Sequence, residues 1–79
     1  MSYEVTDGQV RNARARRGQA LVAALGAIET LRNAAKNHRA KRRWEQAAAC
    51  EHEALRHLDV IRVQAIYIDC ANRALGESP

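Results

Sequence analysis

Apolar residues recur at intervals of three and four along most of the chain, which is the spacing of one face of an α-helix. No proline occurs between Thr6 and Gly76, so nothing in this stretch forbids a helix. The pattern predicts an all-α protein. In the first half the apolar positions form a single face, which consists of Leu21, Ala24, Leu25, Ile28, Leu31 and Ala35.

The second half carries a heptad repeat, the pattern of a helix that packs lengthwise on another helix. The repeat begins at Trp44 and is interrupted by the polar residues Glu51 and Asn72. We expect its later apolar positions to form a core or dimer seam. These positions are Leu58, Ile61, Ala65, Ile68 and Leu75.

The segment 58–70 has apolar side chains on more than one face, because Val60, Val63 and Ile66 lie outside the heptad seam. A helix that is apolar on several faces is buried on more than one side. We therefore expect one side to face the first helix and another to face a second copy. Residues 60–68 are also β-branched enough for a strand. The chain offers no second strand to pair with it, however, and an isolated strand is not stable.

The first helix has a clear start and the second a clear end. Thr6 followed by Gln9 is a capping box, in which each side chain accepts a hydrogen bond from a free backbone N–H. Gly76 directly after Leu75 is a typical helix stop.

The middle of the chain has a weaker break signal. Only Asn37 and His38 indicate a break between two helices, since asparagine tolerates the left-handed backbone of a helix end. We predict a single domain over residues 1–79, with helices over about 7–36 and 40–75 and a bend over 37–39. One continuous helix is the alternative, because neither glycine nor proline enforces a turn here.

A chain of 79 residues buries only roughly 60% of the surface that it exposes when unfolded, so a lone monomer is marginally stable. Two hairpins that pair into a four-helix bundle would supply the missing burial. Cys50 and Cys70 are too few for a disulfide framework. They are also too far apart along one helix to bond to each other, which leaves open a bond between two copies.

Basic residues gather in two segments without any acid, 11–17 and 36–43, whereas the rest of the chain has four basic and nine acidic residues. Such segments can contact nucleic-acid phosphates. The chain lacks the pattern of a helix-turn-helix, however, and a hairpin would place the segments at opposite ends. A candidate partner surface takes residues from both segments and from their edge, namely Arg14, Arg17, Arg39, Arg42, Arg43 and Trp44.

Little in the chain indicates catalysis. Cys50, Glu53 and His57 share a helix face, but a structural zinc site needs four ligands. We expect Glu53 and His57 to form a solvated pair and Cys50 to pack, so no metal or other cofactor is expected. The chain contains no nucleophile–base–acid set and no glycine-rich phosphate loop, so we do not expect an enzyme.

The sequence therefore predicts a non-enzymatic homodimer that binds an unidentified protein as an adaptor, inhibitor or regulator. Phage and plasmid accessory proteins that bind host factors often have this build, which is an analogy of class alone. The alternative is a nucleic-acid-binding protein that uses segments 11–17 and 36–43. Without a long apolar run or a signal peptide, we expect a cytoplasmic protein that does not enter membranes.

Overall fold

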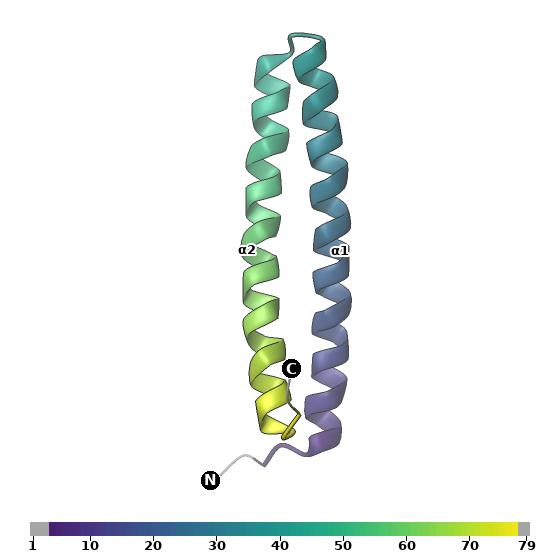
Figure 1. Cartoon of the computed structure of the whole chain (residues 1–79), viewed down its shortest axis with the longest axis vertical. Coiled ribbons are helices and arrows are strands. Elements are labelled where there is room, and N and C mark those ends of the chain that lie inside the picture. The colour runs from purple at the N-terminus through teal and green to yellow at the C-terminus, as the bar shows by residue number, and fades with distance from the viewer. Residues whose placement is uncertain (1–3, 78–79) are drawn as a thin grey trace.

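The computed structural model describes residues 4–77 and contains two α-helices, α1 (Asp7–Ala40) and α2 (Trp44–Ala74). The helices run antiparallel and side by side (Figure 1), and they form a rod with extents of 57 × 27 × 15 Å. The predicted all-α helical hairpin is confirmed. No strand occurs between residues 4 and 77, so the strand alternative for 60–68 is wrong, and the hairpin excludes one continuous helix.

The two predicted end signals act as expected. The Gln9 N–H donates to the Thr6 hydroxyl oxygen at 3.2 Å, and the Thr6 N–H donates to Gln9 Oε1 at 2.9 Å. This reciprocal capping box starts α1 at Asp7, whose carboxylate favours the positive end of the helix dipole. At the other end Gly76 has a φ of 72°, the left-handed backbone that closes a helix after its last turn.

The bend lies later than predicted, and the predicted break at 37–39 is wrong. Helix α1 continues through Asn37 and His38 to Ala40, and residues 41–43 connect the helices. The chain turns at Arg42, which has a φ of 57°, and the Arg43 N–H then donates to the His38 carbonyl at 2.8 Å. An arginine thus takes the left-handed conformation that was expected of Asn37.

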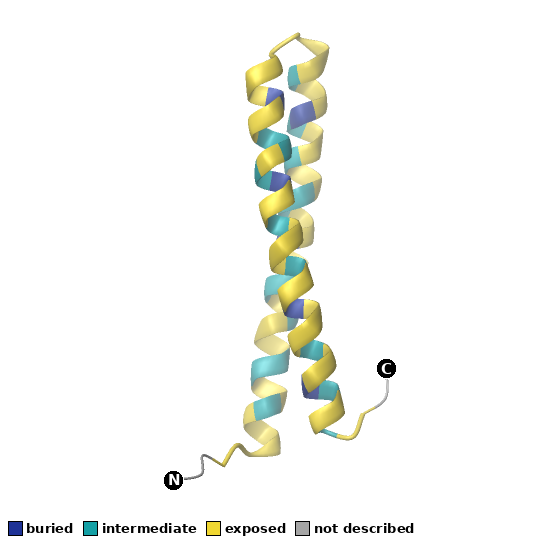
Figure 2. Ribbon diagram, turned by 90° about the vertical axis from the view of Figure 1, so that its left-hand side faces the viewer, coloured by how far each residue is buried: buried dark blue, intermediate teal, exposed yellow. Residues whose placement is uncertain are grey.

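The apolar residues that are buried between the helices are small, whereas larger ones such as Leu31 and Ile61 are half-buried there. The buried apolar residues are all alanines, and among residues 4–77 no large side chain is fully buried. The buried positions lie along the line where α1 and α2 meet (Figure 2). Small side chains allow two helices to approach closely, but each removes little apolar surface from water. The buried alanines are Ala24, Ala35, Ala47, Ala54 and Ala71.

The inward face of α2 differs from the predicted heptad seam. Ile61, Ile68 and Leu75 are half-buried, as an interior seam requires, but Leu58, Ala65 and Trp44 are exposed. Every second position of the predicted seam is replaced by the residue directly before it. His57 therefore faces inward in place of Leu58, and the buried Gln64 faces inward in place of Ala65. The full inward column is Ala47, Cys50, Ala54, His57, Ile61, Gln64, Ile68, Ala71 and Leu75.

Candidate interaction surfaces

Large apolar side chains lie on the outside of the hairpin. Leu25 is 52% exposed, Leu55 60% and Leu58 49%. On α2, Leu55, Leu58 and Ile66 follow helical spacing and share a side. We call the surface that consists of Val22, Leu25, Leu55, Leu58 and Ile66 the apolar flank. Leu55 is not among the residues that the sequence predicts for a site, although its spacing of three residues to Leu58 is a signal for it.

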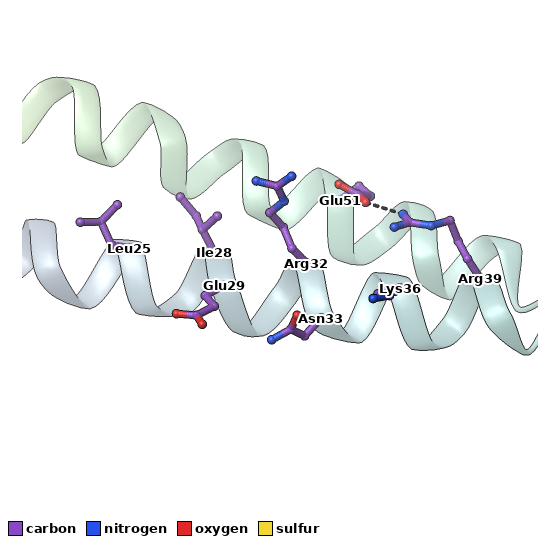
Figure 3. Close-up of a pocket in the computed structure, with 8 residues that line it drawn as sticks. All are labelled: Leu25, Ile28, Glu29, Arg32, Asn33, Lys36, Arg39 and Glu51. Carbon is purple, nitrogen blue, oxygen red and sulfur yellow. Dashed lines mark hydrogen bonds and ion pairs between the residues drawn. The ribbon is translucent and has the colours of Figure 1, made fainter.

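An open groove of about 470 Å³ is lined by residues of both helices, so these residues of α1 and α2 lie on the same side of the rod. Leu25 and Ile28 line its apolar end, Arg39 lies toward the other end, and Glu51 lines it from α2 (Figure 3). Figure 3 shows the side chains of Leu25, Ile28 and Arg32 directed from α1 toward α2. Because Glu51 lies one heptad before Leu58, Leu25 and Leu58 face the same side of the hairpin.

A second apolar stripe follows α2 outside the apolar flank. Val60, Val63 and Tyr67 are spaced by three and four residues and are all exposed. The guanidinium carbon of Arg17 lies 4.9 Å from the centre of the Tyr67 ring, a cation–π contact between the helices. This stripe is therefore partly covered within the hairpin.

The basic residues of segment 11–17 contribute to contacts between the helices. Arg14 Nη1 donates to Asn72 Oδ1 at 2.8 Å and also pairs with the Glu77 carboxylate. Arg17 Nη1 donates to the buried Gln64 Oε1 at 3.5 Å, in addition to its contact with Tyr67. These two predicted partner-surface residues hold the chain ends together.

The basic residues at the other end of the rod are less engaged. Arg39 pairs with Glu51 at 2.6 Å, also visible in Figure 3. Within the described part of the chain, Lys41, Arg42 and Arg43 have no carboxylate within ion-pair distance. All three are exposed, and the neighbouring Trp44 side chain is 62% exposed. We call Lys41, Arg42, Arg43 and Trp44 the basic bend.

The structure thus separates the predicted partner surface into two parts. Arg39, Arg42, Arg43 and Trp44 lie at or beside the bend, whereas Arg14 and Arg17 lie near the opposite end of α1 (Figure 1). A single hairpin cannot present both groups to one compact ligand.

The weak metal candidates do not form a site. Between residues 4 and 77, no three His, Cys, Asp or Glu side chains are placed to hold a metal ion. Glu53 instead accepts a hydrogen bond from Arg56 at 2.9 Å, while Cys50 and His57 lie half-buried on the inward column. Both cysteines are free thiols, and Cys70 is exposed.

In the described residues, neither helix has a stretch apolar and long enough to cross a membrane. Comparisons with protein-family models, with curated proteins and with solved structures found no match to this chain. A proposal on function therefore depends on the apolar flank and the basic bend.

Proposed function

We propose that this protein is a non-enzymatic binding module that works as a homodimer and binds another protein. One observation carries the proposal: the apolar residues that the hairpin buries are all alanines, whereas Leu25, Leu55 and Leu58 remain about half exposed or more. A chain of this size generally needs a larger fully buried apolar core than alanines supply. A second copy that covers the apolar flank would complete that core as a four-helix bundle.

The exposed area supports self-association. The chain exposes 6324 Å², whereas a compact folded monomer of 8.8 kDa exposes roughly 4800 Å². The excess of roughly 1500 Å² lies within the roughly 1000–2500 Å² that each protomer of an obligate homodimer buries. In a two-fold dimer the same flank is used by both copies, so each leucine contributes twice.

The basic bend supports the binding of a different protein. It lies at the end of the rod, whereas the apolar flank runs along its side, so a dimer formed through the flank leaves the bend free. Tryptophan and arginine are the residue types most enriched among the energetic centres of protein interfaces. The bend presents Trp44 next to Arg42 and Arg43.

The same cations support a second candidate, a nucleic-acid-binding protein. Arginines and lysines that lack carboxylate partners neutralise phosphates and release counterions, which produces affinity without base contacts. This candidate predicts retention of the protein on heparin and a steep loss of DNA affinity with salt. It also predicts a shallower salt dependence once Arg42 and Arg43 are replaced.

The homodimer is tested by light scattering on a size-exclusion column at micromolar protein concentration. We expect twice the chain mass for the wild type at low and high salt, and the single-chain mass for Leu58→Asp and Leu25→Asp. Each substitution removes two leucines from the dimer, one from each copy, and each loss costs about 1.5–3 kcal/mol of burial. The dissociation constant therefore rises by several orders of magnitude. Val5→Asp is the matched control, because Val5 is similarly exposed but lies outside both helices. A wild-type monomer would refute the homodimer.

Binding to another protein is tested by affinity capture from a nuclease-treated lysate of the native host. We expect a protein that the wild type and Val5→Asp retain and that Trp44→Ala loses. Retention that disappears when nucleic acid is digested would favour the second candidate instead.

A further inference from the structure

We infer that the basic bend binds an acidic segment of the partner protein, one that also carries an apolar side chain to cover Trp44. This inference rests on the proposed function, in which the bend is the partner surface. It adds the chemistry of the partner.

The first support is uncompensated charge. Segment 36–43 has five basic residues and no acidic one. Arg39 is neutralised by Glu51, but Lys41, Arg42 and Arg43 are consecutive, exposed and, in the described residues, without a carboxylate partner. Three adjacent cations repel one another, and an anion that lies across them relieves this repulsion.

The second support is the backbone of Arg42. Its φ of 57° is a conformation that costs an L-residue free energy and that glycine adopts without penalty. Glycine at this position would therefore make the same turn at a lower cost in free energy. Residues kept in a costly backbone conformation cluster where their side chains act on a ligand.

The third support is Trp44, the only tryptophan in the chain. It is the first residue of α2 and is 62% exposed, directly after the three cations. An exposed indole beside guanidinium groups matches a ligand that has both an apolar side chain and carboxylates.

The distribution of charge favours an acidic protein segment over nucleic acid. Outside segments 11–17 and 36–43 the chain has nine acidic and four basic residues, so a polyanion laid along the rod would meet net negative charge. The other basic segment lies toward the far end of a 57 Å rod, where Arg14 and Arg17 are engaged in contacts within the chain. The basic bend is therefore an isolated end, suited to a short ligand that meets it end-on.

The test uses the full chain and a fluorescein-labelled synthetic peptide rich in Asp, Glu and Leu. Anisotropy of the label measures binding, and the emission of Trp44 reports contact at the bend. Single-stranded and duplex DNA oligonucleotides with the same label are measured in parallel. We expect the peptide to bind more tightly than either DNA and to shift the Trp44 emission. Its affinity should fall as salt screens the charges.

Three variants locate the site. Arg42→Gly removes the guanidinium but suits the backbone, so we expect unchanged mass, a melting temperature no lower than wild type, and peptide affinity reduced about tenfold. Trp44→Ala should lose affinity to a similar extent. Arg16→Ala, an exposed arginine of the other basic segment, is the control and should bind the peptide as the wild type does.

The inference is overturned if the peptide does not bind, if a DNA binds more tightly, or if Arg16→Ala lowers affinity as much as Arg42→Gly. Failure of the peptide while the dimer and the Trp44-dependent capture of a protein persist would reject only the acidic chemistry. Loss of both the dimer and the capture would reject the proposed function itself.

Discussion

The seam between the two helices and the apolar flank differ in which apolar side chains each one buries or exposes. The seam buries alanines such as Ala35 and Ala54, while the flank exposes leucines such as Leu25 and Leu58. A compact monomer has the opposite arrangement, since large apolar residues stabilise most when they are buried. The contact within the hairpin thus gains little from large apolar side chains, and the proposed dimer would gain more by covering the flank.

Enlarging a buried alanine of the seam should have a large effect on stability. Ala35 is fully buried, so Ala35→Leu inserts a large side chain where the helices approach closely. Overpacking of this kind costs about 1–3 kcal/mol. We expect the free energy of unfolding, measured by urea titration with circular dichroism, to fall by that amount.

Ala23→Leu is the control for this experiment, because Ala23 is an exposed residue of the same helix. It should change the free energy of unfolding by less than about 0.5 kcal/mol. If Ala35→Leu stabilised the protein, the seam would have room for larger residues and would not be a close contact between alanines.

Local signals in the sequence predicted the helix ends well. The capping box of Thr6 and Gln9 and the stop at Gly76 each depend on residues within one helical turn, so no distant contact can override them easily. The bend was misplaced because the residue that turns there, Arg42, has no intrinsic preference for a left-handed backbone.

The register of α2 could not be predicted for a different reason. Periodicity identifies the apolar positions of a helix but not which partner covers each of them. The column that contains Leu58 is more apolar than the column that contains His57, so periodicity places Leu58 in the seam together with Ile61 and Ile68. The hairpin instead uses the neighbouring column with His57 and Gln64, which leaves Leu58 on the flank. The exposed Trp44 was placed in the seam by the same reasoning.

Gln64 is the one buried polar residue in the described seam, at 8% exposure. Its only side-chain partner there is Arg17, at the long distance of 3.5 Å. Gln64→Leu replaces a weakly bonded polar group with an apolar side chain of similar size, so we expect stability to rise by about 1 kcal/mol in the same urea titration. The reverse exchange on the flank, Leu58→Gln, should weaken the dimer. A loss of stability in Gln64→Leu would show that the bond to Arg17 stabilises the seam.

Gly18 and Gly26 of α1 lie on different faces of the helix, so alanine substitutions at the two positions compare the side of the apolar flank with the outer face. A Cβ added at Gly18 or Gly26 meets no atom within 4 Å in the hairpin. Alanine in place of a helical glycine stabilises by about 0.5–1 kcal/mol, so Gly26→Ala should raise the melting temperature without changing the mass. Gly18 lies seven residues before Leu25 and shares its face, so a second copy on the flank would meet the new methyl group. We expect Gly18→Ala to gain less stability than Gly26→Ala and to weaken the dimer on light scattering. Equal gains with unchanged mass would show that the flank near Gly18 remains uncovered.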